Sequence, residues 1–384
     1  MKTKLVNVDS ISCLLFFCSL TLWMTPLSSF ALYVLVPFFI LISFYNGWRL
    51  INKLPQTRFY ILLIIWIFIS CMVADDPNLA LHRYVSIFAT FLFSLATYYV
   101  ATRPQCAKYL FFSYIVFFIY LLYRMLASGE MLGAIVEATE DSRDVDGINA
   151  NAYAYYLFFA TCSVLLLMEN VKKRYIFKFL VYLILIGLTA FVAMRIAARQ
   201  VFVIQLPLIL FFMYTNYIKY GNKMTRILSV ITLGGLIVLI LPTFLLIYND
   251  SYLALRSEVS FDDDVRSELM IKAIQNGLEH PLFGVGPDNM KTFSHCSYTH
   301  MFESSGLFAL LLFCMIIGIS ILDMFRLYLK KRNRTLFSLS FVLIIYAIDN
   351  LVYSFFDVPF MMAFLFLIIG YGQVISKQKT SLCF

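Results

Sequence analysis

Long apolar runs, separated mostly by short polar segments, recur along almost the whole chain. Runs of about 18 or more apolar residues are typical of membrane-spanning helices. The pattern predicts twelve spans, at roughly residues 10–25, 28–45, 59–74, 80–101, 109–127, 151–168, 179–195, 200–218, 227–248, 303–322, 336–354 and 358–375. A second apolar run follows the first within a few residues, without a convincing cleavage site, so a cleaved signal peptide is not expected.

The expected fold class is therefore all-α: a polytopic integral membrane protein with one membrane domain over residues 1–384. Composition agrees with this prediction. The chain is 61% hydrophobic and only 14% charged, whereas soluble domains carry about a quarter charged residues.

The distribution of basic residues predicts the orientation. If the N-terminus is cytoplasmic, 21 of the 30 Lys and Arg residues fall on the cytoplasmic side of the twelve spans, as the positive-inside rule requires. Both termini are then cytoplasmic. The net charge of +8 reflects this bias next to anionic lipid, and no nucleic-acid partner is expected. Only Cys296 of the eight cysteines lies in an outward loop, so no disulfide framework is predicted.

Two outward segments are longer than the other loops, at residues 128–150 and 249–302. Ordered loops beyond about 15 residues are usually functional. Within the second segment, residues 265–280 alternate apolar and polar positions as a short amphipathic helix does. The turn-rich stretch PLFGVGPDN (281–289), with Gly284 and Gly286, follows it.

Two groups of side chains carry candidate chemistry. Arg195 and Arg199 stand where one span ends and the next begins, a depth at which arginine is costly unless it is paired or functional. The alternative is that they snorkel to the interface or pair with loop acids. His295 and His300 precede an apolar run together with Glu303. They are either surface histidines or a general base, with Glu303 orienting the imidazole or capping the following helix.

No metal or cofactor is predicted. A zinc site needs three or four ligands at recognisable spacing, and the outward histidines show no such pattern. The run Asp262, Asp263 and Asp264 is interpreted as a solvated loop face rather than a magnesium site.

Four pieces of sequence, in this order, resemble the O-antigen ligase and Wzy-type polymerase superfamily of bacterial membrane glycosyltransferases. They are DGINANAYAYYLFFA (146–160), AARQVF (197–202), RSELMIKAIQNGLEHPLFGVGPDNM (266–290), and a histidine, His295, eleven residues before a glycine, Gly306, that begins an apolar helix. Two positions depart from the family pattern: Cys296 replaces an Asn and Ala198 replaces a Ser. Arg199 is preferred over Arg195 as the family arginine because a full apolar span follows it.

The resemblance covers about residues 145–320 and implies a fold like that of the C-type glycosyltransferases. It implies a metal-independent, inverting transfer of glycan from an undecaprenyl-pyrophosphate lipid to an acceptor hydroxyl. This would occur at the periplasmic face of the bacterial inner membrane. The implied partners are the lipid-linked glycan, an acceptor glycan lipid, membrane lipids and a chain-length regulator. The implied site has His295 as general base, Arg199, Arg266 and Arg195 on the pyrophosphate, and Asn149, Asn151, His300, Glu303, Gly284 and Gly286 in acceptor or loop positioning.

Two jobs within the family share this chemistry. A polymerase, which we favour because such enzymes use two outward loops of this kind, adds glycan to the next lipid-linked repeat. The alternative is a ligase that transfers glycan to lipid A-core or another acceptor. A polytopic transporter or lipid-linked glycan flippase is less favoured, because the sequence shows no repeated halves.

Overall fold

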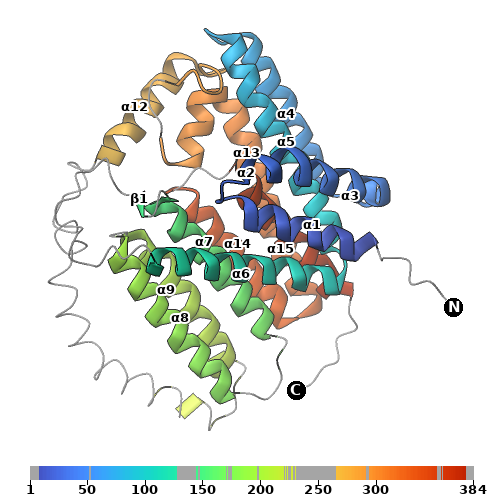
Figure 1. Cartoon of the computed structure of the whole chain (residues 1–384), viewed down its shortest axis with the longest axis vertical. Helices are drawn as coiled ribbons and strands as arrows, with labels where there is room; N and C mark the ends of the chain where they lie inside the picture. Colours follow the sequence, from blue (N-terminus) through green and yellow to red (C-terminus); the bar gives the residue numbers. More distant parts are fainter. Residues whose placement is uncertain are drawn as a thin grey trace. The chain divides into compact units, whose positions relative to one another are not determined.

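A computed structural model of the chain describes residues 8–51, 53–127, 144–145, 148–169, 171, 175–196, 199–219, 221, 223, 226–227, 230, 265–290, 294–352, 356 and 358–377 (Figure 1). They belong to two compact units. The first unit comprises Met1–Ser113 and Phe261–Phe384, and the second comprises Tyr114–Ser260.

The first unit is helical in its described residues. Its elements are α1 (Val8–Leu22), α2 (Ser28–Phe30), the π-helix η1 (Ala31–Leu35), α3 (Val36–Ile51), α4 (Pro55–Met72), α5 (Pro77–Ala101), the first part of α6 (Pro104–Ala127), α12 (Val265–Glu279), α13 (Ser297–Lys331), α14 (Arg334–Asp349) and α15 (Pro359–Lys377). The second unit contains the rest of α6, a two-residue hairpin of β1 (Asp144–Val145) and β2 (Ile148–Asn149), α7 (Ala150–Glu169), α8 (Tyr175–Arg195), α9 (Arg199–Met213) and the π-helix η3 (Tyr214–Lys219).

Nine helical stretches in the described part of the chain are long and apolar enough to cross a membrane. The expectation of a multi-pass, all-α membrane protein is thereby confirmed, but not the count of twelve spans. The stretch 10–25 forms a helix of only 15 residues, about 22 Å at the usual rise. It ends in a turn that precedes Pro26, which cannot continue the hydrogen-bonding pattern. The predicted span 227–248 lies outside the described residues, apart from positions 227 and 230.

The predicted spans at 303–322 and 336–354 have different boundaries in the structure. α13 begins at Ser297, six residues earlier than expected, because the polar stretch before Gly306 is itself helical. α14 ends at Asp349 after 16 residues, where the chain turns at Asn350 and Leu351. α14 is shorter than the roughly 20 apolar residues that a perpendicular span needs.

Prolines determine where several helices start. α4, α5, α6 and α15 begin at Pro55, Pro77, Pro104 and Pro359. Proline is favoured in the first turn because its fixed φ suits the helix and its missing N–H has no helical partner to lose. At α5 the residue before the proline is also an N-cap. The Asp76 carboxylate accepts hydrogen bonds from the Asn78 and Leu79 amides at 3.0 and 3.1 Å.

The core of the first unit is built around α15. This helix is apolar on all sides and buried along almost its whole length, as expected of a helix surrounded by others. Its Phe360 ring packs edge-on against Phe16 of α1 and Phe93 of α5, and Phe39 of α3 completes the cluster. Gly370 lets α15 approach α5, because a Cβ there would lie 2.8 Å from the Tyr98 carbonyl oxygen.

The second unit packs α7, α8 and α9 together. Asn216 of η3 donates to the Tyr182 hydroxyl of α8 at 2.6 Å, and its own side-chain oxygen faces the Lys178 ammonium at 3.5 Å. These buried polar contacts join the start of α8 to the end of α9. The two helices therefore form an antiparallel pair, with Arg195 at the far end of α8 and Arg199 at the start of α9.

Candidate functional site

The residues Pro281–Gly286 and Glu303–Leu307 pack directly on one another, and we call this pair of segments the glycine junction. The Val285 amide donates to the Glu303 carbonyl and the Gly286 amide to the Ser304 carbonyl, both at 2.9 Å. The Leu307 amide donates to the Pro281 carbonyl at 2.8 Å. These bonds satisfy backbone groups that the break in α13 would otherwise leave unpaired.

Three glycines make the junction sterically feasible. Gly306 has φ 80° and ψ 179°, a conformation open essentially only to glycine, and it divides α13 into two helical parts. A Cβ at Gly306 would lie 2.0 Å from the Leu282 carbonyl oxygen, and one at Gly284 would lie 2.5 Å from the Glu303 carbonyl oxygen. At Gly286, which has φ 94°, an added Cβ would lie 2.3 Å from the Ala74 Cβ. The predicted position Gly284 is therefore a site of close backbone approach, and Gly286 packs against the Ala74 side chain.

Helix α4 contacts the junction through the side chains of Ser70 and Trp66. The Ser70 hydroxyl lies 2.5 Å from the Phe283 carbonyl oxygen and 3.1 Å from that of Ser304. The Trp66 indole donates to the Ser305 carbonyl at 3.0 Å, and its ring stacks on Phe283 with centroids 5.0 Å apart. The carbonyl groups released by the bend at Gly306 thus find partners on a neighbouring helix.

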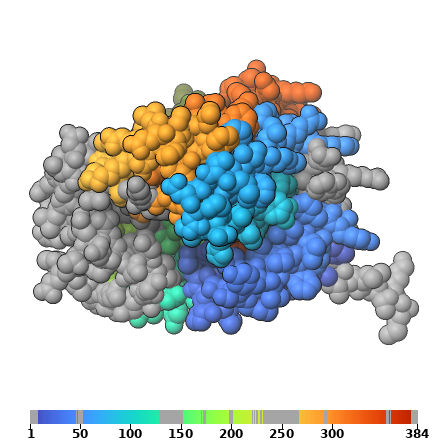
Figure 2. All heavy atoms as spheres, turned by 90° about the horizontal axis from the view of Figure 1, so that it is seen from above, coloured from blue at the N-terminus to red at the C-terminus, as the bar shows by residue number. Residues whose placement is uncertain are grey.

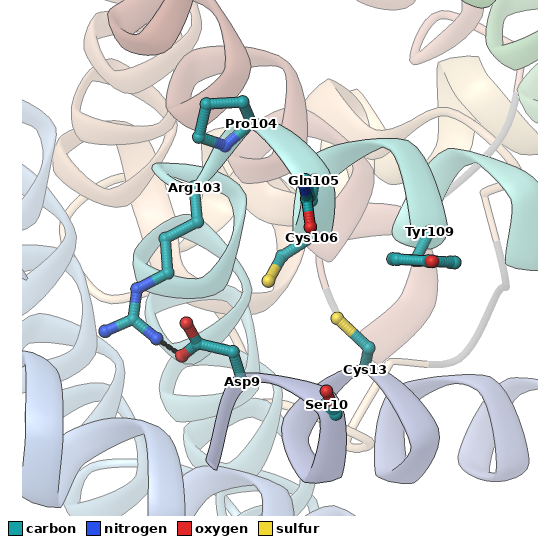
Figure 3. Close-up of a pocket in the computed structure, with 8 residues that line it drawn as sticks. All are labelled: Asp9, Ser10, Cys13, Arg103, Pro104, Gln105, Cys106 and Tyr109. Atoms are coloured by element: carbon teal, nitrogen blue, oxygen red, sulfur yellow. Dashed lines mark ion pairs between the residues drawn. The ribbon is translucent and has the colours of Figure 1, made fainter. Parts of the chain in front are cut away.

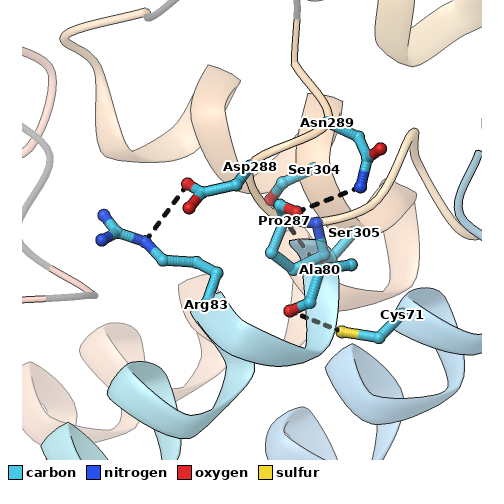
Figure 4. A network of polar contacts seen from close by, with 8 residues as sticks. All are labelled: Cys71, Ala80, Arg83, Pro287, Asp288, Asn289, Ser304 and Ser305. Atoms are coloured by element: carbon cyan, nitrogen blue, oxygen red, sulfur yellow. Dashed lines mark hydrogen bonds and ion pairs between the residues drawn. The ribbon is translucent and has the colours of Figure 1, made fainter. Parts of the chain in front are cut away.

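The start of α5 holds the other end of the turn (Figure 4). Arg83 lies 3.4 Å from the Asp288 carboxylate, and both side chains are about one-third exposed. The Asn289 side chain accepts from the Asp76 amide at 3.0 Å and donates to the Asp76 carbonyl at 3.1 Å. The turn that follows α12 consequently lies against the α4–α5 corner, on the face shown in Figure 2. Arg83 is held by a structural ion pair.

Glu303 joins α12 to α13. Its side chain is completely buried, and Oε1 accepts a hydrogen bond of 2.7 Å from the Asn276 amide of α12. One residue further along α12, Gly277 lets the Phe302 ring lie against the helix. Glu303 is the seventh residue of α13 and lies three residues before the bend at Gly306. Its hydrogen bond to Asn276 joins the amphipathic helix to α13. Its roles in orienting a histidine or capping the apolar helix stay predictions.

His295 and His300 stand in different surroundings. His295 lies two residues before α13 begins and is partly exposed. His300 lies in the first turn of α13, is only 3% exposed, and contacts the Phe356 ring edge-on with centroids 4.9 Å apart. Because His295 precedes the helix, the regular spacing of side chains round an α-helix does not relate the directions of these two residues. The two histidines differ instead in the exposure of their side chains.

A buried carboxylate near this segment was not among the predicted site residues. Asp349, at the end of α14, is 2% exposed, and no described residue is a hydrogen-bond partner of its Oδ2. The same end of α14 is bonded to the start of α13, since the Ser297 amide donates to the Asn350 carbonyl at 2.8 Å and the Tyr298 hydroxyl to the Ala347 carbonyl at 2.9 Å. The only signal in the sequence is an Asp-Asn pair near the end of an apolar run.

The second unit holds the other predicted residues. Arg195 ends α8, is 7% exposed, and its Nη1 has no hydrogen-bond partner in the described part of the chain. The structure describes Arg199 as the first residue of α9, Asn149 as the end of β2, and Asn151 as the second residue of α7. The side chains of these three residues lie outside the described part of the structure.

Arg266 lies at the start of α12, and its side chain is likewise outside the described part. The helix itself is the amphipathic one predicted at 265–280. On its exposed face Lys272 pairs with Glu268 one turn away at 2.5 Å. The hydrogen bond from Lys272, together with its charge, holds the pKa of the Glu268 carboxyl below its usual value.

The structure therefore brings together Gly284, Gly286 and Glu303 in the junction, with His295 and His300 at the start of the same α13 helix. The other predicted residues belong to the second unit: Asn149, Asn151, Arg195 and Arg199. No group of three or more His, Cys, Asp or Glu side chains that could hold a metal ion occurs among the described residues.

Comparison of the chain with protein-family models and with curated proteins finds no match.

Proposed function

We propose that the chain is a glycosyltransferase of the inner membrane that moves glycan from an undecaprenyl-pyrophosphate lipid to an acceptor hydroxyl. Within this reaction we favour polymerisation of lipid-linked repeats, with His295 as the general base and Arg199, Arg266 and Arg195 on the pyrophosphate. The proposal rests on the resemblance of residues 145–320 to the superfamily and on the arrangement of α12 and α13.

The observation that supports it most is the clamping of α12 onto the start of α13. The Asn276–Glu303 bond and the glycine junction fix both segments to the same unit. Arg266 stands ten residues before Asn276, about 15 Å along the helix. The described backbone of α12, which starts at Val265, is thereby joined to the unit that contains His295, and this supports the assignment of Arg266 and His295 to one site.

The difference in exposure favours His295 over His300 as the base. A base must reach the proton of an acceptor hydroxyl at hydrogen-bonding distance. His295 is partly exposed, whereas the ring of His300 is buried against Phe356. An incoming sugar can therefore approach His295 without rearrangement of the core.

Arg195 offers a site for the leaving group within the second unit. Its guanidinium is buried, and one nitrogen has no hydrogen-bond partner among the residues that the structure describes. A buried cation with an unsatisfied N–H donor is unfavourable unless an anion accepts the hydrogen bond and balances the charge. Phosphate oxygens suit the planar fork of arginine, and a guanidinium keeps its charge at any physiological pH. Charge that develops on the departing pyrophosphate would be stabilised without a metal ion.

The test is a reaction of purified protein in lipid nanodiscs with one defined lipid-linked repeat, with and without a lipid A-core acceptor. Mass spectrometry of the products distinguishes the three alternatives. Polymerisation gives a ladder of lipid-linked oligomers from the repeat alone. Ligation gives a product only when the acceptor is present. Unchanged repeat in both reactions, with repeat moved across the bilayer of a proteoliposome, would replace the proposal by a transporter.

A further inference from the structure

A cavity of about 460 Å³ opens between α1 and the start of α6, inside the first unit and away from the glycine junction (Figure 3). An ion pair between Asp9 and Arg103 stands at its mouth. Cys13 of α1 and Cys106 of α6 point toward one another across it. None of these residues belongs to the predicted site, so the cavity requires an explanation of its own.

The cavity continues into a second one of about 350 Å³. Ser10, Cys13 and Tyr109 line both, so the two form one groove. Its lining positions recur every three or four residues on each helix, as Ser10, Cys13, Leu14 and Phe17 on α1 and as Cys106, Tyr109, Phe112 and Ser113 on α6. Side chains at this spacing share one helical face. The groove therefore runs lengthwise between the two helices.

The groove changes character along its length. Its first end carries the carboxylate of Asp9, the guanidinium of Arg103 and the amide of Gln105. Its second end is formed by the apolar side chains of Leu14, Phe17 and Phe112. Leu14 is 60% exposed and Phe112 is 53% exposed. In a membrane protein such side chains contact acyl chains, and a polar end joined to an apolar trough matches the shape of a lipid.

The ion pair at the polar end is held in place but still accessible. Arg103 donates to the Tyr99 hydroxyl, and its guanidinium lies 4.6 Å from the centroid of the Tyr99 ring. The side chains of Arg103 and Asp9 nevertheless remain 35% and 27% exposed. The site thus presents a fixed cation and a fixed anion side by side. A ligand that carries both signs is complementary to both.

We propose that this groove binds one zwitterionic phospholipid with a primary ammonium headgroup, of the phosphatidylethanolamine type. The phosphate lies at Arg103, the ammonium donates to the Asp9 carboxylate, and one acyl chain lies along Leu14, Phe17 and Phe112. A quaternary ammonium cannot donate a hydrogen bond to Asp9, and an anionic headgroup without an amine leaves Asp9 facing negative charge. In the predicted topology this end of the groove is cytoplasmic. The proposal is independent of the reaction proposed above.

The test is native mass spectrometry of the full-length protein, purified in detergent and titrated separately with phosphatidylethanolamine, phosphatidylcholine and phosphatidylglycerol of identical acyl chains. We expect one phosphatidylethanolamine to be retained about fivefold better than the other two lipids, a preference of the size that a partly exposed ion pair supplies. Equal retention of all three lipids would overturn the proposal, as would a preference for phosphatidylglycerol.

Two variants examine the two ends of the groove. Asp9→Asn removes the negative charge with little change of shape, so the preference for phosphatidylethanolamine should disappear and phosphatidylglycerol should bind at least as well. Leu14→Trp fills the trough and should lower retention of every lipid at this site, whereas Leu41→Trp, at a 65% exposed position on α3, should not. An unchanged preference in Asp9→Asn would contradict the assigned headgroup. Asp9→Asn also keeps the proposal testable should Leu14→Trp fail to elute as a folded monodisperse protein.

Discussion

His295 and His300 are five residues apart, yet one precedes α13 partly exposed and the other lies buried in its first turn. This difference gives them distinct expected roles at the residue scale. In the proposed reaction His295 accepts a proton from an incoming hydroxyl, whereas His300 packs against Phe356 at the start of α13.

We predict that His295→Ala lowers glycan transfer by about 10²- to 10⁴-fold, the usual contribution of a general base, while thermal stability and retention of the lipid-linked donor stay unchanged. His300→Ala is the matched control. It should lower the melting temperature through loss of buried contacts but retain most transfer per folded molecule. Transfer measured on purified, monodisperse variants decides between them. Transfer retained in His295→Ala but abolished in His300→Ala would reverse the assignment.

At the scale of elements, the bend in α13 is the feature on which the candidate site depends. We predict that Gly306→Ala destabilises the protein by about 1–3 kcal/mol from the backbone conformation alone, and by more once the clash with the Leu282 carbonyl is included. Gly318→Ala, in the regular part of the same helix with no atom near its added methyl, should be neutral or stabilise by about 0.5–1 kcal/mol. Melting temperatures in one detergent measure both. Equal behaviour of the two variants would contradict the bend.

The clamp between α12 and α13 allows a second prediction. Asn276→Asp places a carboxylate against that of Glu303 and should destabilise the protein, by roughly 1–3 kcal/mol or more for a buried polar mismatch. The double variant Asn276→Asp with Glu303→Gln reverses donor and acceptor, because the new amide can donate to the new carboxylate. We expect it to recover most of the stability and transfer that Asn276→Asp loses. Additive losses in the double variant would show that the two side chains do not interact.

The apolar pattern predicted most helices, since length and hydropathy alone distinguish a span. It also predicted the amphipathic helix, which is α12. The pattern missed the early start of α13, because SYTHMFESS is polar and becomes helical only by packing against α12 and α14. It placed Glu303 at a helix start for the same reason. The clamp to Asn276 joins residues 27 positions apart, and no local signal in the sequence reports such a contact.

Among the site residues, too, some could be predicted from the sequence and others are evident only in the structure. Gly284 and Gly286 stood out in the sequence as turn residues, and in the structure both have a positive φ and no room for a Cβ, which explains a glycine at each position. Asp349 did not stand out, because one acid near the end of an apolar run has no distinctive spacing. Its burial and its unpartnered oxygen appear only when α14 is packed against α13.

At the scale of the whole molecule, the proposed reaction needs residues from both units. Arg199 belongs to the second unit, and Arg266 and His295 belong to the first. We predict that all three converge on one bound lipid-linked substrate in an experimental structure of the complex. Any one of them more than about 15 Å from the other two would be too far to share a pyrophosphate and its acceptor, even through bridging water, and would contradict a shared site.

The most direct test of the account is elongation of a defined undecaprenyl-pyrophosphate-linked repeat by the purified protein in excess EDTA. Because arginine side chains are proposed to neutralise the leaving pyrophosphate, the account predicts full formation of the product ladder without a divalent cation, and its loss in His295→Ala under the same conditions. Transfer abolished by EDTA and restored by Mg²⁺ or Mn²⁺ would contradict the proposed chemistry, and an unaltered repeat in every condition would contradict the proposed function.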